Sequence, residues 1–422
     1  MVIEGLEWAR AQDAADPLSR FRGRFEALEA VEGVAPIYLC GNSLGLQPRR
    51  TRELVLAELD LWARRGVEGH FEGEWPWYSY HEPLQGPMAR VVGARPEEVV
   101  VMGSLTGNLH AMMASFYRPT AERFKIMIEG SAFPSDRYAV ASQARLHGLD
   151  PAQVVVELQA RPGEVVLREE DIEAAIEEQG ERLALVMFGG VNYYTGQAFD
   201  LHRITAAAHG VGAKAGFDLA HAAGNLALSL HEDGVDFAVW CTYKYLNSGP
   251  GGVAGLFVHE RHGSSPGLPR QAGWWGNDPA TRFEMPSEFA PQRGAAGWQV
   301  SNAPILPMAA LRASLELFDE AGVSALRARS ERMTGYLVGL LDGLGGRVEI
   351  ITPREASRRG CQVSIRAVSG GGRAIFESLV KGGVVCDFRS PDVIRVAPVP
   401  LYNTFEEIWR FVQLLKESAS DD

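Results

Sequence analysis

The sequence predicts an α/β protein with two domains, the larger built on a mostly parallel seven-stranded sheet and the smaller a C-terminal α/β domain. Short apolar runs alternate with helix-like segments in the first part of the chain, and long helical periodicity takes over after Pro304. The length of 422 residues also exceeds the size at which a single core usually stops growing. We therefore expect an N-terminal arm over residues 1–60 that contributes to the small domain, a large domain over 61–305, and a small domain over 306–422.

The expected strands of the large domain are short runs rich in β-branched and other apolar residues. They cover residues 99–102, 125–128, 154–158, 183–188, 213–217, 237–241 and 253–258. Helix-like segments lie between several of them, for example 169–176 and 201–209. This alternation is typical of parallel strands joined by crossover helices.

The last third of the chain begins with two long amphipathic helices, which we expect over residues 306–317 and 325–341. Strand-like runs follow at 348–351, 362–368, 384–388 and 393–399, and the chain closes with an amphipathic helix over 405–417. The first 60 residues read as a helical arm followed by an extended segment around 38–48.

The composition excludes several classes of function. With 46% hydrophobic and 22% charged residues the chain is typical of globular proteins, and its net charge of −12 offers no basic surface for nucleic acid or an anionic membrane. The first residues lack the uncharged core of a signal peptide, and no stretch is apolar for the roughly 18 residues of a membrane span. We expect a cytoplasmic protein with neither nucleic-acid nor membrane partners.

The cysteines give no sign of a disulfide framework or a metal site. Cys40, Cys241, Cys361 and Cys386 are scattered, with no CxxC spacing and no paired histidines nearby. Free thiols in a reducing compartment are therefore the expectation, and no metal is expected.

Two strand ends carry the residues most indicative of chemistry. Lys244 follows the apolar run 237–241 and precedes a Gly/Pro-rich turn, while Asp218 closes another expected strand, with His221 three positions later. In open α/β sheets ligands bind beyond the carboxyl ends of strands. In enzymes that use pyridoxal 5'-phosphate (PLP), the protein usually supplies a lysine amine that forms a Schiff base and a carboxylate that faces the pyridinium nitrogen. Either motif alone is common by chance, so the pairing carries the prediction.

Two further strand ends supply a phosphate site and a ring contact. The turn 103–110 leads into an apolar helix, and exposed backbone N–H groups with a hydroxyl at a helix N-terminus bind anions without a basic residue. A plain helix cap is the alternative. Phe133 lies beyond the next strand end and could stack on a pyridine ring, with Asp136 as a polar neighbour, although an isolated Phe is more often a core residue.

Nine blocks of sequence, in order and with compatible spacing, resemble the kynureninases. This PLP-dependent family belongs to the aspartate-aminotransferase-like fold group and is related to the class-V aminotransferases, so the resemblance implies the PLP-dependent transferase fold of type I. The blocks cover residues 39–48, 104–106, 133–136, 193–197, 216–222, 243–247, 273–276, 300–302 and 395–403.

The resemblance also implies roles for individual residues. Lys244 would carry the Schiff base and Asp218 would face the pyridinium nitrogen, while Tyr243 would assist late proton transfers. The remaining implied cofactor contacts are Leu105 and Thr106 to the phosphate, Phe133 to the ring, Asp136 and His221 to polar atoms, and Trp274 and Asn302 from a neighbouring subunit. A homodimer with shared active sites is thus implied.

The implied reaction is hydrolytic cleavage of the Cβ–Cγ bond of L-kynurenine or 3-hydroxy-L-kynurenine, giving L-alanine and anthranilate or 3-hydroxyanthranilate. Such an enzyme serves tryptophan catabolism, the kynurenine pathway and NAD biosynthesis. Arg395 resembles the clamp for the substrate carboxylate, and a guanidinium binds a planar carboxylate through two hydrogen bonds. His70, Ser301 and Asn302 match positions that face the aromatic ring in members tuned to the 3-hydroxy substrate.

One departure and two alternatives accompany this interpretation. Gly189 stands where some relatives have a serine that reaches the cofactor. A related class-V PLP lyase such as a cysteine desulfurase is one alternative, but it needs a mobile nucleophilic cysteine. A non-catalytic PLP-fold binding protein is the other, and such proteins usually lose the lysine or the acid, both of which are present here.

Overall fold

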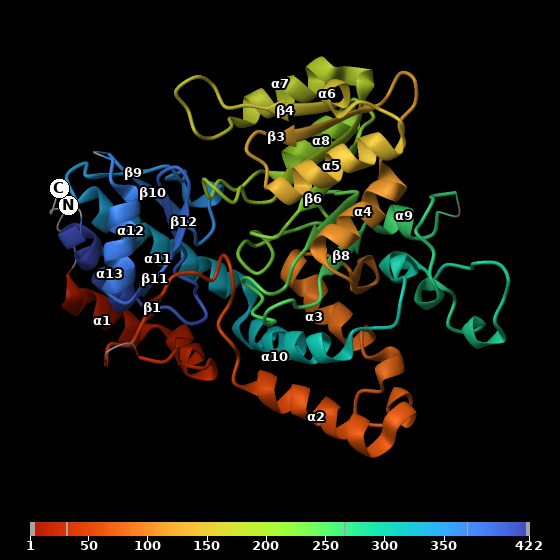
Figure 1. The fold of residues 1–422 in the computed structure, drawn as a ribbon, viewed down its shortest axis with the longest axis horizontal. Coiled ribbons are helices and arrows are strands. Elements are labelled where there is room, and N and C mark those ends of the chain that lie inside the picture. Colours follow the sequence, from red (N-terminus) through yellow and green to blue (C-terminus); the bar gives the residue numbers. More distant parts are fainter. Residues whose placement is uncertain (1–4, 31–32, 266, 369, 419–422) are drawn as a thin grey trace.

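The structure is a computed structural model that describes residues 5–30, 33–265, 267–368 and 370–418. A large sheet with helices on both faces lies beside a second group of strands and helices from the C-terminal part of the chain, coloured blue (Figure 1). Within these described ranges no helix is both long and apolar enough to cross a membrane.

The seven strands predicted for the large domain are confirmed, and they form one sheet. In the order β2-β8-β7-β6-β5-β3-β4, every neighbouring pair is parallel except the two that β8 makes. The strands are β2 (Val99–Val101), β3 (Lys125–Glu129), β4 (Val155–Leu158), β5 (Leu183–Gly189), β6 (Lys214–Asp218), β7 (Phe237–Trp240) and β8 (Gly255–Val258).

Helices cover both faces of this sheet, which explains why its strands are apolar at nearly every position. One face packs on α4 (Leu105–Phe116) and α5 (Pro134–Leu146). The other packs on α3 (Glu82–Val92), α7 (Glu169–Gln179), α8 (Leu201–Gly210) and α10 (Ile305–Ala321). Strand β7 shows the alternation, because Phe237 and Val239 belong to the first core and Ala238 and Trp240 to the second.

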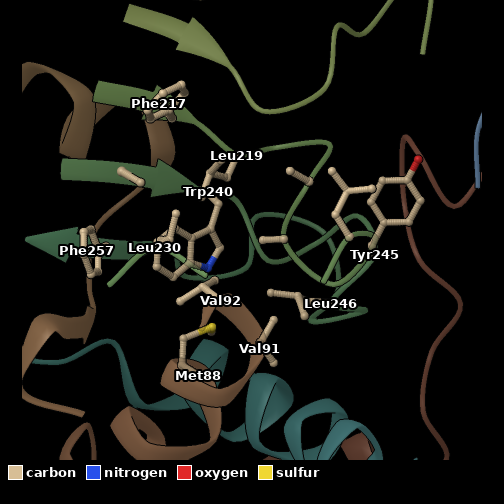
Figure 2. Close-up of a cluster of buried hydrophobic side chains, with 14 of the residues drawn as sticks. Met88, Val91, Val92, Phe217, Leu219, Leu230, Trp240, Tyr245, Leu246 and Phe257 are labelled. Atoms are coloured by element: carbon tan, nitrogen blue, oxygen red, sulfur yellow. The ribbon is translucent and has the colours of Figure 1, made fainter. Parts of the chain in front are cut away.

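Trp240 lies at the centre of the second core, between the sheet and helix α3 (Figure 2). Its cross-strand partner is Gly255, and a Cβ atom there would lie 2.2 Å from the indole Cε2. The absence of a side chain at 255 therefore makes room for the largest side chain of this core.

The C-terminal sheet is antiparallel and has the order β12-β13-β10-β9. Its strands are β9 (Val348–Ile350), β10 (Val363–Ala367), β12 (Asp387–Arg389) and β13 (Val393–Val396), and the helices with it are α11 (Val323–Asp342), α12 (Gly372–Lys381) and α13 (Phe405–Ser418). The single strand expected over 384–388 is instead two strands, because β11 (Val384–Val385) leaves this sheet and pairs with the N-terminal arm.

The N-terminal arm contains α1 (Leu6–Ala15), the 3₁₀ helix η1 (Pro17–Arg24), β1 (Ile37–Tyr38) and α2 (Arg50–Arg65). Helix α1 packs on α13, and β1 pairs in parallel with β11. Helix α2 runs along α10 (Figure 1). The arm thus contacts both groups of strands, and the division of the chain after residues 60 and 305 stays a prediction.

The segment after β1 joins the C-terminal sheet to the loop that follows β7. The Leu39 carbonyl accepts the N–H of Ala397 at 2.8 Å, next to the end of β13. Six residues later, the Gly45 N–H donates to the Tyr243 carbonyl at 2.8 Å. We call residues 39–45 the strap.

Short helices make many of the remaining connections. They are η2 (Gly66–His70), η3 (Trp77–Ser79), η4 (Pro96–Glu98), α6 (Pro151–Val154), η5 (Gly180–Arg182), α9 (Glu260–Gly263), η6 (Trp274–Gly276), η7 (Arg282–Glu284), η8 (Gly294–Trp298) and η9 (Ala356–Arg358).

Candidate active site

A cavity lies at the carboxyl ends of β3, β5, β6 and β7, the edge of the sheet where ligands of open α/β folds bind. It holds about 550 Å³ of space, part of it open to solvent. Its lining residues are Leu105, Thr106, Glu129, Phe133, Ser135, Asp136, Gly189, Val191, Tyr193, Asp218, Ala220, His221, Tyr243 and Lys244. Eight of the predicted site residues therefore line one cavity, and so does Gly189: the eight are Leu105, Thr106, Phe133, Asp136, Asp218, His221, Tyr243 and Lys244.

Lys244 and His221 form the central contact of the cavity. The lysine Nζ lies 3.0 Å from His221 Nε2 and 5.9 Å from the centroid of the Phe133 ring. Burial, reinforced by the positive charge of Lys244, lowers the pKa of His221 well below its ordinary value, so the ring is neutral. The second ring nitrogen of His221 is Nδ1. That Nδ1 is buried, and in the described chain it has no hydrogen-bond partner.

Two aspartates lie side by side next to this pair. Asp218, at the end of β6, accepts the N–H of Ala220 at 2.7 Å. Burial raises the pKa of Asp218, while this N–H and the charge of Lys244 act in the opposite direction. Burial and then the charge of Asp218 raise the pKa of Asp136 well above its ordinary value. Asp136 therefore holds a proton while Asp218 is the carboxylate of the pair.

The N-terminus of α4 forms the far wall of the cavity. Leu105 and Thr106 are its first residues, and Thr106 Oγ1 lies 2.8 Å from Ser135 Oγ, near the start of α5. Two hydroxyls and the unpaired N–H groups of a first helical turn bind an anion without a basic side chain. Ser135 was not singled out from the sequence, although it lies between the predicted Phe133 and Asp136.

Glu129 is a second residue of the cavity that the sequence analysis does not identify. It is the last residue of β3, it is buried, and both of its carboxyl oxygens lie 3.2 Å from the Gly189 N–H. Its sequence signal is the same as that of Asp218, an acid that closes an apolar run.

Arg395 lies beside the cavity on β13, fully buried. Its Nε is 3.0 Å from Asp387 Oδ1, its Nη2 is 2.9 Å from Asp387 Oδ2, and its Nη1 donates to the Tyr193 carbonyl at 2.7 Å. These contacts use three of the five N–H donors of a guanidinium and leave one on each Nη nitrogen. Tyr193 itself lines the cavity, so the guanidinium is held at its border.

Five predicted residues do not line this cavity within one chain, namely Arg395 at its border and four residues that lie elsewhere. His70 Nδ1 lies 3.0 Å from the Val67 carbonyl, and its ring packs edge-on against Trp77. Trp274 is partly exposed, and its indole N–H donates to the Arg282 carbonyl at 3.3 Å. Ser301 and Asn302 are exposed and line a different cavity. Their roles stay predictions, which for Trp274 and Asn302 involve the site of a second subunit.

The four cysteines are free thiols, and none belongs to the lining set given above. Burial raises the pKa of each thiol. None of the four is therefore placed to act as the nucleophile that a desulfurase needs.

Only one group in the described ranges has metal-ligand spacing, namely Glu98, His231 and His259. Glu98 accepts the backbone N–H groups of Arg95 at 2.9 Å and Glu260 at 2.8 Å, and its Oε1 lies 2.9 Å from His231 Nδ1. These bonds already occupy the carboxylate, which acts as a cap for short helices.

The residues of the main cavity fit PLP. They offer a lysine amine, a carboxylate for a protonated ring nitrogen, an aromatic side chain, and an anion site at a helix N-terminus. Two buried polar atoms, His221 Nδ1 and Asp136 Oδ1, have no partner in the part of the chain that the structure describes. A bound ligand would supply hydrogen-bond partners for both atoms.

Comparisons with known proteins agree with this chemistry. The family described as "Kynureninase C-terminal domain" matches residues 326–415. The chain is 57% identical to "Kynureninase" of Myxococcus xanthus (strain DK1622) over 415 residues, which cover 98% of this chain and 97% of the relative. It is 58% identical to "Kynureninase" of Koribacter versatilis (strain Ellin345) over 407 residues, 96% of each chain.

Solved structures support the fold class. A cysteine desulfurase from Thermococcus onnurineus NA1 superposes with a TM-score of 0.73 at 16% identity, covering 92% of this chain and 95% of that one. The cysteine desulfurase CsdA from Escherichia coli gives 0.74 at 18% identity, covering 96% and 98%. At these identities the likeness concerns the fold alone, and the predicted PLP-dependent transferase fold of type I is confirmed.

Proposed function

This chain belongs to the kynureninase family, and from that premise we propose that it hydrolyses the Cβ–Cγ bond of L-kynurenine or 3-hydroxy-L-kynurenine with PLP as cofactor. The products are L-alanine and anthranilate or 3-hydroxyanthranilate. The observation that carries the proposal is the gathering of Lys244, Asp218 and the N-terminus of α4 in one cavity, in a chain that matches its relatives over nearly its full length.

The cavity residues divide the binding of the cofactor among them. The N-terminus of α4, with Thr106 and Ser135, would hold the phosphate with the help of Tyr243, and Phe133 would cover the ring. Asp218 would face the ring nitrogen, while Asp136 and His221 would contact other polar atoms. When bound, PLP supplies an aldehyde for amines and an electron sink for the bond changes at the substrate.

Lys244 and Tyr243 are the proposed proton carriers. Lys244 would hold the cofactor, and its free amine would take the proton from the substrate Cα. Burial raises the pKa of Tyr243 above its ordinary value, so its phenol keeps its proton and can deliver it in the late steps. The neutral His221, whose Nε2 lies 3.0 Å from Nζ, would orient the lysine through a hydrogen bond.

Arg395 is the proposed clamp for the substrate carboxylate. Its free N–H groups, one on each Nη, would bind the two carboxylate oxygens together. The guanidinium is already oriented by Asp387 and the Tyr193 carbonyl, so little entropy is lost when substrate binds.

Assembly, location and pathway belong to the same proposal. We propose a cytoplasmic homodimer in which Trp274 and Asn302 of one subunit complete the site of the other, and in which His70 and Ser301 face the substrate ring. The exposure of Trp274, Ser301 and Asn302 in the single chain supports this assembly. The enzyme would serve tryptophan catabolism, the kynurenine pathway and NAD biosynthesis.

An assay with both substrates tests the proposal. Purified protein should be yellow when loaded with PLP, and it should release the aromatic amine and L-alanine in equal amounts. A yellow protein that releases neither product from either substrate would overturn the proposed reaction, and a protein that takes up no PLP would overturn the cofactor as well.

A further inference from the structure

Glu129 is a buried acid of the cavity to which the proposed reaction gives no task. It is 4% exposed, and its carboxyl faces the same space as Lys244 and Asp218. The hydrogen bonds recorded for this carboxyl come from backbone N–H groups, its own and that of Gly189. Two N–H donors leave part of the acceptor capacity of a carboxylate unused.

Gly189 allows this carboxyl to lie against the end of β5. A Cβ atom at residue 189 would lie 2.9 Å from Glu129 Oε1, closer than carbon and oxygen atoms approach without displacement. The Glu129 carboxyl thus occupies the space that a side chain at 189 would need. The glycine at this position and the acid at 129 therefore form one structural pair.

The surroundings of Glu129 disfavour a negative charge. Three carboxyl groups line the cavity, namely Glu129, Asp136 and Asp218, and Lys244 is the one lysine or arginine in the lining set. The other titratable groups of that set are His221 after β6, Tyr193 after β5 and Tyr243 after β7. Burial, with the charge of Asp218 acting in the same direction, raises the pKa of Glu129 to about 7. Carboxylates that share a dry site cannot all ionise.

We propose that Glu129 is a further positioning residue of the cofactor site, which keeps a proton when PLP is bound and so leaves Asp218 as the ionised carboxyl that faces the ring nitrogen. This inference rests on the proposed cofactor site. A protonated carboxyl has one O–H donor, and the Glu129 carboxyl lines the same cavity as Asp218. Together with the protonated Asp136, it limits the negative charge of the three-carboxyl cluster to that of Asp218.

The Glu129→Gln variant tests whether the neutral form is the working form, because an amide has the size of a protonated carboxyl and cannot ionise. Loaded with PLP at pH 6, the variant should match the wild type in cofactor content and visible absorption. As the pH rises through about 7, the wild-type absorption should change because a second carboxylate appears near the ring. The Glu129→Gln variant should lack this change in absorption near pH 7.

Unfolding of the loaded protein gives a second readout that does not depend on activity. The pKa of Glu129 in the folded protein lies above its unfolded value of about 4.3, so folding favours the protonated form. Its stabilising effect is complete below pH 4 and is lost as the pH rises to 7. Glu129→Gln should therefore unfold at the wild-type temperature at pH 4 and roughly 2–5 °C above it at pH 8.5.

Glu157→Gln is the matched control. Glu157 lies on the neighbouring strand β4, opposite Ile128, and pairs with Arg137 outside the cavity. This variant should keep the wild-type absorption change near pH 7. If Glu129→Gln also keeps it, or fails to load PLP at pH 6, the inference is wrong while the proposed function stands. If the wild type itself takes no PLP, the proposed function fails and this inference fails with it.

A variant pair tests the close approach of Glu129 and Gly189. Gly189→Ala should displace the carboxyl and lower the PLP content of the protein, because its Cβ would collide with Oε1. In a Glu129→Ala background the collision partner is absent, so adding Gly189→Ala should cause little further loss. Equal losses in both backgrounds would contradict the pairing of these two residues.

Discussion

At one edge of the seven-stranded sheet, Glu129 and Asp218 are buried at the carboxyl ends of β3 and β6, and both have a raised pKa. At the opposite edge, Asp236 is buried just before β7, and its pKa is lowered. Burial acts on all three carboxyls in the same direction, so the difference lies in their partners.

Asp236 is surrounded by donors from three other elements. Its Oδ2 lies 2.8 Å from His209 Nε2 and accepts the Ala215 N–H at 2.8 Å, and its Oδ1 lies 2.7 Å from His262 Nε2. Arg261 and Lys214 approach Oδ1 at 3.0 and 3.4 Å. Burial opposes ionisation, but the hydrogen bonds from the two histidines, the charge of Lys214 and the Ala215 N–H together outweigh it.

This difference in hydrogen-bond partners separates a carboxyl group that stabilises the fold from carboxyl groups with open capacity to bind a ligand. Asp236 joins the ends of α8, β6 and α9 and has its acceptor positions filled. The cavity carboxyls lie beside buried atoms without partners in the described chain, His221 Nδ1 and Asp136 Oδ1. Groups with perturbed pKa values and open hydrogen-bonding capacity are typical of functional sites.

The largest expected loss of activity distinguishes two lysines, one at each of these edges of the sheet. Lys244 lies in the cavity, whereas Lys214 pairs with Asp236. Lys244→Ala should still bind PLP noncovalently but lose at least about 10³-fold in kcat, because it removes the proposed proton carrier at the substrate Cα. Lys214→Ala should keep its activity. Borohydride reduction and peptide mapping should locate the pyridoxyl label on Lys244, and a label on Lys214 would reverse the roles of the two edges.

Arg395→Ala should have the next largest effect. Loss of a charge-assisted bidentate partner in a desolvated site costs about 2–5 kcal/mol. We expect kcat/KM to fall by roughly 30-fold to several thousandfold while PLP stays bound. Arg366, on the adjacent strand β10, pairs with Glu349 at the surface and provides the control, since Arg366→Ala should leave kcat/KM unchanged. Loss of bound PLP in Arg395→Ala would mean that Arg395 is structural.

Asp236→Asn should reduce stability and leave catalysis intact. The loss should be about 2–4 kcal/mol at pH 7, less than for a fully buried ion pair because Lys214 and Arg261 are partly exposed. The lowered pKa means that this stabilisation is complete above pH 4 and is lost as the pH falls further. Urea unfolding from pH 3 to pH 7 measures the difference between wild type and variant, which should shrink in acid.

Asp233 is the control for this edge, three residues earlier in the same connection. Burial raises its pKa to about 6, so Asp233→Asn should not destabilise the protein at pH 7. If both variants lose the same stability, the hydrogen bonds around Asp236 do not explain its contribution. A fall in kcat/KM for Asp236→Asn would show that the two edges are coupled.

The smallest expected effect concerns substrate choice within the active edge. A histidine and an amide can hydrogen-bond the ring hydroxyl of 3-hydroxykynurenine, and a site built for that contact penalises the plain substrate. The double variant His70→Trp, Asn302→Thr should shift the ratio of kcat/KM values toward L-kynurenine by roughly 5- to 30-fold. An unchanged ratio, or a wild type that already favours L-kynurenine, would mean that these side chains do not set specificity.

Local sequence patterns were sufficient to predict the sheet and most of the cavity. A strand buried on both faces is a continuous apolar run, and parallel strands end at one edge, so Asp218 and Lys244 could be expected together. The strand expected over 384–388 was wrong because its two halves pair with different partners, β1 and β13, which no local pattern encodes.

The missed features depend on contacts between distant segments. Glu129 closes an apolar run as Asp218 does, but that pattern is shared with many solvent-exposed acids, and the close approach of Gly189, which is 60 residues away, appears only in the folded chain. The pairing of Asp387 with Arg395 follows from the antiparallel register of β12 and β13. Asp236 gathers side chains from α8, β6 and α9, which lie close together only after folding.

The strap, residues 39–45, links the C-terminal sheet to the loop that follows β7. One end is bonded to Ala397, two residues after Arg395, and the other to the Tyr243 carbonyl, next to Lys244. A rotation of the C-terminal sheet that moved the guanidinium toward the cavity would therefore pull on the loop that carries the lysine. Seven residues of backbone thus connect the strand that carries Arg395 with the loop that carries Lys244.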